Sequence, residues 1–456
     1  MRDLTQGPIT KTIIAMAAPV AAGMIFQTLY LLIDLYFVAK VGDSAVAGVG
    51  SAGTLMFMVM AITQILAVST VSLMSQAVGR KQQAEANKVF NQSMALAILL
   101  GVLTLCVGLL AADAYMGQIA ADAATREQGA TFLRWFIPGM SMQFAMMAMA
   151  SALRATGIVK PGMLVQMVTV ILNIILAPIM IAGWGTGKAM GVMGAGLASS
   201  LSVTVGIIIL IFYFLTQERY VKFDTRQFAP DFAVWKRMLD IGLPAGGEML
   251  LMFVYFGIIY MVIKDFGAAA QAGFSIGGRI MQSIFMPTMA VAFAIGPIVG
   301  QNFGAGKMDR VREACKMGII LNAAVMLLVT ILVQINPQLL MLGFTEEKAV
   351  LDVGGDFLSI ISLNFVAQGV VFSCSGIFQG LGNTKPALLS STIRLLVFIP
   401  VAFLISHREG FQLHELWYVS MLAVVIQAVV SFLLVQREIR LKSHAHRAAT
   451  AAAATA

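Results

Sequence analysis

Twelve apolar runs, each long enough to cross a lipid bilayer as a helix, take up most of this 456-residue chain. A bilayer core of roughly 30 Å needs about 20 helical residues per crossing. The runs fall at residues 13–38, 45–77, 89–112, 132–152, 161–181, 194–215, 238–263, 269–299, 317–335, 357–378, 386–405 and 416–435. They leave no tract for a sizeable extramembrane domain, which argues against a membrane enzyme with its chemistry in an extramembrane head. We expect an all-α integral membrane protein with twelve transmembrane helices.

Composition narrows the class further. Only 11% of the residues are charged, against about 25% in soluble proteins. In so apolar a chain, the formal charge of +8 indicates loop charge that orients the protein in a membrane rather than a nucleic-acid partner. Three scattered cysteines and four histidines have no spacing typical of disulfides or metal ligands. No Walker A pattern is present, so we expect an ion gradient as the energy source.

Charged loops predict the topology. Alternate connections and both chain ends hold 21 basic residues, whereas the opposite connections hold six. By the positive-inside rule, the richer side is cytoplasmic. We therefore expect a multi-pass protein of a bacterial or archaeal cytoplasmic (inner) membrane, with both termini in the cytoplasm.

The two halves of the chain look like copies of each other. At a constant offset of 225 residues, Pro19 matches Pro244, Gly42 matches Gly267, Gly48 matches Gly273, Gln76 and Gly79 match Gln301 and Gly304, and Gly157-x-x-Lys160-Pro161 matches Gly382-x-x-Lys385-Pro386. Such repeats are typical of secondary transporters. We expect two pseudo-symmetric six-helix lobes around a central cavity. The N-terminal lobe with its following linker would span residues 1–222, the C-terminal lobe residues 223–442, and a disordered tail residues 443–456.

Five motifs follow one another along the chain. They are Tyr30-Leu-Leu-Ile-Asp34-Leu-Tyr-Phe-Val-Ala, Arg154-Ala-Thr-Gly, Asn173 with Gly191-Val-Met-Gly-Ala-Gly-Leu-Ala-Ser199, Gly242-Leu-Pro-Ala-Gly-Gly-Glu248, and Phe378-Gln-Gly-Leu-Gly-Asn-Thr-Lys-Pro386. In this order they resemble the multidrug and toxic compound extrusion (MATE) family. The resemblance spans nearly the whole chain. It implies a non-enzymatic antiporter that exports drugs or organic cations in exchange for inward H⁺ or Na⁺. Such an antiporter needs no cofactor other than the coupling ion, and we expect the protein to be a monomer.

Two acids lie well inside apolar runs, Asp34 and Glu248. Acids within membrane crossings usually face a protein interior and serve a function. The alternative for Asp34 is that its side chain reaches the outer surface beside Lys40. The alternative for Glu248 is a structural ion pair with Arg279 or Arg394. Otherwise both acids are candidate ion-coupling residues.

In the resembling family, the first-helix acid works with polar groups of the fifth and sixth helices, which here are Asn173 and Ser199. One branch has a second acid where this chain has Ala177, and another has an aspartate in the tenth helix, where no acid occurs between Asp356 and Glu409. Because Na⁺ prefers several oxygen ligands, these departures favour H⁺ over Na⁺.

Several polar, aromatic and methionine side chains near the two acids are candidates for binding substrate. Methionine repacks around ligands of different shape, and aromatic rings attract cations. The candidates are Gln27, Tyr30, Met249, Phe253, Tyr255, Asn364, Gln368 and Arg394; Asn364 and Gln368 are also possible partners of Glu248. The alternative functions are a flippase of lipid-linked saccharides or lipids from the related superfamily, and a channel or receptor. Two acids and few deep basic residues favour a cationic or neutral amphipathic substrate over an anionic lipid.

Overall fold

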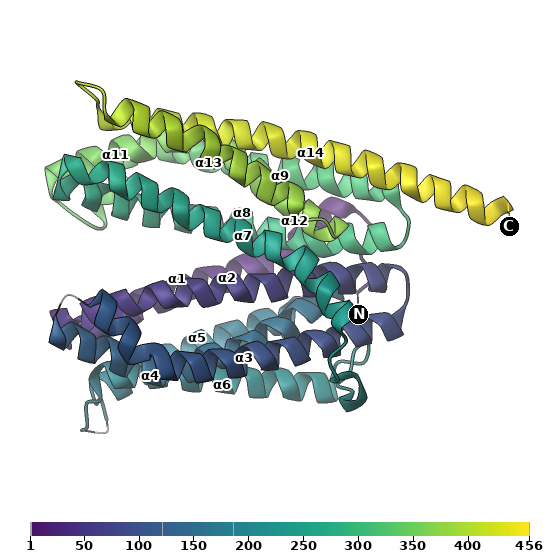
Figure 1. The fold of residues 1–456 in the computed structure, drawn as a ribbon, viewed down its shortest axis with the longest axis horizontal. Helices are drawn as coiled ribbons and strands as arrows, with labels where there is room; N and C mark the ends of the chain where they lie inside the picture. Colours follow the sequence, from purple (N-terminus) through teal and green to yellow (C-terminus); the bar gives the residue numbers. More distant parts are fainter. Residues whose placement is uncertain (1, 121, 186, 456) are drawn as a thin grey trace. The chain divides into compact units, whose positions relative to one another are not determined.

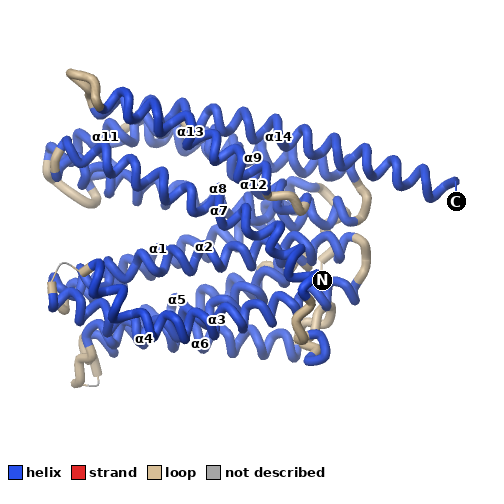
Figure 2. Tube along the Cα trace, viewed as in Figure 1, coloured by secondary structure: helices blue, strands red, loops and turns tan. Residues whose placement is uncertain are grey.

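The protein is all-helical in a computed structural model that describes residues 2–120, 122–185 and 187–455, without the side chains of residues 28–32, 35, 43, 54 and 449–455 (Figures 1 and 2). The first repeat contains α1 Ile9–Ala39, α2 Asp43–Gly79, α3 Gln83–Ile119, α4 Ala123–Ala155, α5 Lys160–Ile181 and α6 Gly191–Thr216. The second contains α7 Phe232–Ile263, α8 Ala268–Gly304, α9 Met308–Ile335, α10 Pro337–Leu342, α11 Lys348–Ser362, α12 Phe365–Leu381, α13 Lys385–Ser406 and α14 Leu413–Thr455. Short 3₁₀ turns lie at Thr225–Gln227 and Lys264–Phe266.

Eleven helices in the described ranges are long and apolar enough to cross a membrane. The pair α11 and α12 is bent by 59° and, counted as one broken span, raises the number to twelve. Only helices or closed barrels satisfy every backbone hydrogen bond within lipid. Large apolar side chains remain exposed along the helices, as at Leu328, Ile331 and Leu332 of α9. The predicted twelve-helix membrane fold is therefore confirmed.

The chain divides into two compact units whose boundaries fall beside prolines. The N-terminal unit is Met1–Asp3 with Pro19–Gly242, and the C-terminal unit is Leu4–Ala18 with Leu243–Ala456. Helix α1 is divided at Pro19 and α7 just before Pro244. Proline inside a helix removes a backbone hydrogen bond and bends the axis. The first helix of each repeat thus begins in one unit and continues in the other, and the division at Gly242 differs from the predicted boundary at residue 222.

The two units repeat the same helix crossing at the 225-residue offset. In the N-terminal unit, α2 meets α4 where a Cβ on Gly48 would lie 2.7 Å from the Gly129 nitrogen. In the C-terminal unit, α8 meets α11 where a Cβ on Gly273 would lie 3.0 Å from the Gly354 nitrogen. Real Cβ atoms essentially never come as close as 2.7 Å, and 3.0 Å is tighter than nine in ten of their contacts, so both crossings favour glycine. Close helix packing therefore explains why both repeats have a glycine at this position, Gly48 in the first and Gly273 in the second.

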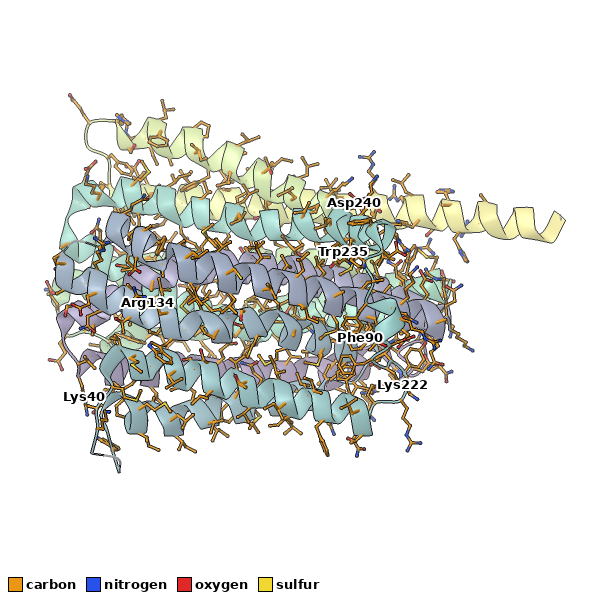
Figure 3. The ribbon with its side chains drawn as sticks, turned by 60° about the horizontal axis from the view of Figure 1, so that its bottom comes forward. Lys40, Phe90, Arg134, Lys222, Trp235 and Asp240 are labelled. Atoms are coloured by element: carbon orange, nitrogen blue, oxygen red, sulfur yellow. The ribbon has the colours of Figure 1, made fainter. Side chains whose placement is uncertain are left out.

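The connector between α6 and α7 is folded against α3 rather than extended. Asn87 Oδ1 accepts from the Lys222 backbone nitrogen at 2.7 Å, and Gln92 Nε2 donates to the Ala229 carbonyl at 2.8 Å. Phe90 stacks on Phe214 beside it. Figure 3 shows Phe90 and Lys222 near one end of the N-terminal unit and Lys40 near the other.

The last residues of the chain are helical, whereas the sequence predicts a disordered tail at residues 443–456. Residues 443–455 continue α14, and Arg312 NH2 donates to Ser443 Oγ at 3.0 Å. Alanine has the highest helix propensity of all residues, and α14 supplies a helical end that an alanine-rich segment can extend.

Candidate functional site

The N-terminal unit holds Asp34 near the C-terminal end of α1. The side chain is partly buried, and its Oδ1 atom is buried with no hydrogen-bond partner in the described part of the chain. A carboxylate in a membrane interior is costly unless a cation offsets its charge. Asp34 is therefore an acid with capacity to take up a cation.

Asn173 on α5 and Ser199 on α6, the two polar residues that the resemblance associates with Asp34, lie together. Asn173 Nδ2 donates to Ser199 Oγ at 3.1 Å, and the two residues are 2% and 5% exposed. Asp34 takes no part in this hydrogen bond. Ala177, one turn after Asn173, is fully buried, so the position that carries a second acid in one branch of the family is filled here by a methyl group.

The C-terminal unit holds Glu248 on α7, one turn after Pro244. Ser375 Oγ on α12 donates to Glu248 Oε2 at 3.0 Å, and the Ser391 side chain on α13 hydrogen-bonds to the same carboxylate. Hydrogen bonds to a charged group contribute about 1.5–3 kcal/mol each. Glu248 therefore differs from Asp34, because its carboxylate has two hydroxyl partners.

A polar network extends from Glu248 through the C-terminal unit. Gln427 Nε2 donates to Ser391 Oγ at 3.0 Å, and Arg394 NH1 donates to Gln427 Oε1 at 3.3 Å. The Arg394 guanidinium lies 3.8 Å from the centroid of the Tyr255 ring. The Tyr255 hydroxyl in turn hydrogen-bonds with Ser420. All of these groups lie on α7, α12, α13 and α14.

The alternative of an ion pair for Glu248 finds no support among the described side chains. Arg394 reaches the acid only through Gln427 and Ser391. Arg279 is exposed on α8, and no described ion pair joins it to Glu248.

Of the remaining predicted site residues, some join the network around Glu248 and others do not. Asn364 and Gln368 lie at the bend between α11 and α12, 3% and 9% exposed, where the Gln368 backbone nitrogen donates to the Asn364 carbonyl. Neither contributes a described hydrogen bond to Glu248. Tyr255 is 4% exposed and belongs to the network.

Three other predicted substrate residues, Gln27, Met249 and Phe253, are partly exposed on α1 and α7. The Tyr30 side chain lies outside the described residues.

Sequence reasoning missed Ser375, Ser391 and Gln427. Each is an uncharged polar residue inside an apolar helix, whereas the sequence analysis considered only the charged residues there as the centres of a site. Small hydroxyl residues are common in membrane helices, where they hydrogen-bond across helix contacts. Only the relative rotation of α7, α12 and α13 shows which of them meet Glu248.

The two acids are not repeat mates. At the offset of 225, Asp34 corresponds to Ile259 and Glu248 to Gly23. Ile259 is 2% exposed in the apolar core of its unit. Each unit thus carries one of the two candidate coupling acids, at different positions of the repeat and in different surroundings.

Comparison with known proteins identifies the family. The MatE family profile matches residues 19–179 and again residues 244–404, which repeats the offset of 225 found in the sequence. The chain belongs to the MatE family, whose members are membrane transporters and not enzymes.

Two curated relatives and one solved structure show how far the similarity extends. The probable multidrug resistance protein NorM of Thermotoga maritima is 27% identical over 92% of this chain and 90% of its own length. The probable multidrug resistance protein YoeA of Bacillus subtilis is 23% identical over 88% of this chain and 87% of its own length. A MOP superfamily transporter from Pyrococcus furiosus shares the fold with a TM-score of 0.90 at 24% identity, over 96% of this chain and 98% of its own.

Proposed function

We propose that this protein is a multidrug efflux transporter that exports cationic or amphipathic small molecules in exchange for inward protons. Its curated relatives are named multidrug resistance proteins, and it shares their family and nearly their whole length. The observation that carries the exchange mechanism is the buried Oδ1 of Asp34, which has no hydrogen-bond partner among the described residues. An acid in that state gains from binding a cation on each transport cycle and must release it on the other side.

The surroundings of Asp34 favour H⁺ as that cation. Sodium ions prefer several oxygen ligands, often with more than one carboxylate. Here Ala177 is buried one turn after Asn173, so α5 supplies no second acid. Asn173 and Ser199 bind each other and offer only neutral atoms.

Glu248 serves a different purpose in this proposal. Its carboxylate is held by Ser375 and Ser391, and these hydroxyl groups offset part of the cost of its charge. A fixed negative charge in an apolar setting attracts cationic substrates. Arg394 is occupied by Gln427 and Tyr255, so it adds nothing in favour of an anionic lipid substrate.

We further infer that the protein lies in the cytoplasmic membrane with both termini inside, on the basis of the 21 to six division of basic residues. We also propose that it acts as a monomer.

Accumulation of a fluorescent organic cation in cells tests the proposal. Cells that express the protein should accumulate less dye than cells that express Asp34→Asn at the same membrane level. A protonophore should remove the difference. Equal accumulation in both strains before the protonophore is added would overturn the proposed exchange.

A further inference from the structure

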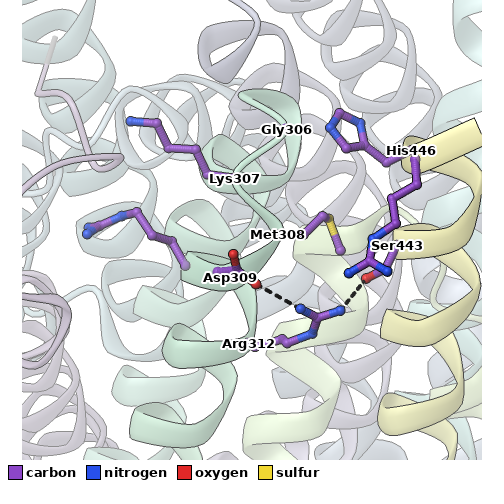
Figure 4. Close-up of a pocket in the computed structure, with 9 residues that line it drawn as sticks. Gly306, Lys307, Met308, Asp309, Arg312, Ser443 and His446 are labelled. Carbon is purple, nitrogen blue, oxygen red and sulfur yellow. Dashed lines mark hydrogen bonds and ion pairs between the residues drawn. The ribbon is translucent and has the colours of Figure 1, made fainter. Parts of the chain in front are cut away.

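A basic pocket lies in the C-terminal unit, where the turn between α8 and α9 meets the end of α14 (Figure 4). Its cavity is about 400 Å³. The lining consists of Gly306, Lys307, Met308, Asp309, Arg310, Arg312, Ser443, His446 and Arg447. Drug export as proposed above gives this pocket no role.

Positive charge dominates the lining. In the described contacts, Lys307 and Arg310 donate hydrogen bonds only to uncharged groups. Lys307 Nζ donates to the Thr5 carbonyl at 3.1 Å, and Arg310 NH2 donates to the Gly7 carbonyl at 3.0 Å. These bonds fix the side chains without neutralising them. The one carboxylate among the lining residues, Asp309, pairs with Arg312 at 2.8 Å. The pocket therefore keeps an excess of positive charge.

The walls are held in place by close packing. Gly306 has a φ of +72°, and a Cβ there would lie 2.8 Å from the His446 ring. Arg312 spans the pocket from Asp309 to Ser443 (Figure 4). These contacts fasten the end of α14 to the start of α9 and give the cavity a defined shape.

The connector between α6 and α7 lies at the equivalent place in the N-terminal unit. At the offset of 225, Arg312 corresponds to Asn87 and Arg310 to Glu85. Asn87 accepts a hydrogen bond from the Lys222 backbone nitrogen of the connector, and Glu85 pairs with Arg80 at 3.0 Å. The second repeat thus has arginines where the first has a neutral residue and an acid, and a cavity where the first has the connector.

We propose that this pocket binds a phosphate group. Arginine forks suit phosphate oxygens, and so do backbone nitrogens in the first turn of a helix. Helix α9 begins at Met308 with no side-chain cap, and the Met308 nitrogen itself donates to the Gly306 carbonyl. The pocket lies at the ends of two membrane spans, α8 and α9, which is the level of lipid headgroups. Basic pockets at that level bind anionic headgroups. The phosphate comes either from an anionic phospholipid or from a soluble phosphate compound, and the same residues would hold both.

Lipid retention by the purified full-length protein tests the proposal. Native mass spectrometry in neutral detergent would count bound phosphatidylglycerol, with phosphatidylcholine as the zwitterionic reference. Calorimetry with inorganic phosphate would form the second arm. The double variant Arg312→Gln with Arg447→Gln removes two charges from the pocket. The matched control, Lys316→Gln with Arg437→Gln, removes two exposed charges from α9 and α14 outside it.

The pocket variant should bind phosphatidylglycerol at least about tenfold more weakly than wild type, and the control less than about twofold more weakly. A loss confined to the lipid arm assigns the phosphate to a headgroup, and a loss in the inorganic phosphate arm assigns it to a soluble compound. Equal losses in the two double variants, or no binding in either arm, would overturn the proposal. If the double variant does not fold, Arg447→Gln alone, at an exposed position of α14, should still weaken binding, and wild-type affinity in that variant would overturn it too.

Discussion

Replacing Asp34 with asparagine should abolish gradient-driven export and leave the protein folded. The substitution keeps the volume of the side chain and removes its charge. An ionised acid at the centre of a bilayer costs about 2.5–3.5 kcal/mol, and the buried Oδ1 has no partner among the described residues to offset that cost. We therefore expect the free energy of unfolding of the variant to equal that of wild type or to exceed it by up to about 3 kcal/mol.

Proteoliposomes provide the assay. Uptake of an organic cation driven by an imposed pH difference should fall to the level of protein-free vesicles, whereas binding of the same cation to the purified variant should persist. Asn173→Ala is the matched control. It removes the hydrogen bond to Ser199, worth about 0.5–1.5 kcal/mol, and should slow driven uptake by no more than about tenfold. Driven uptake by the Asp34 variant within twofold of wild type would refute the assignment of the coupling acid.

Three other predictions follow from the structure. Glu248→Gln should raise the apparent KM for monovalent cationic drugs much more than for neutral ones, because neutral drugs rely on apolar and aromatic contacts. An equal rise in KM for both kinds of drug would contradict a role of Glu248 in attracting cations. Gly48→Val and Gly273→Val should each lower the free energy of unfolding by about 1–3 kcal/mol, because a Cβ meets backbone atoms at both crossings. A wild-type melting temperature in either variant would contradict the packing. Single cysteines placed in residues 114–126 should react with an impermeant thiol reagent from outside intact cells, and those in residues 307–312 should not; labelling of both from the same side would contradict the predicted topology.

Hydropathy and the 225-residue offset predicted most of the fold. Run length is enough to place membrane helices, because lipid leaves the backbone few alternatives. The bend between Ser362 and Phe365 was not predicted, since residues 357–378 form one apolar run with no proline. The helix at residues 443–455 was not predicted, because an alanine-rich segment shows no core-forming pattern and becomes helical here as the extension of α14.

Of the candidate site, the sequence predicted the two acids but not the side chains that hydrogen-bond to Glu248. Asp34 and Glu248 stand out in the sequence because charges are rare in membrane helices. Their partners do not stand out. Glu248 meets Ser375 rather than Gln368, two turns earlier on α12, and this choice depends on how α7 and α12 are rotated toward each other. No pattern within one helix carries that information.

The most direct test of the central claim is transport by wild-type protein in inside-out membrane vesicles, with a pH gradient and a sodium gradient imposed separately. Uptake of an organic cation should follow the pH gradient and be indifferent to sodium, because Asp34 has no second acid on α5. Uptake that rises steeply with sodium at a fixed pH gradient would contradict proton coupling and would make Glu248, with its two serine partners, the candidate sodium ligand.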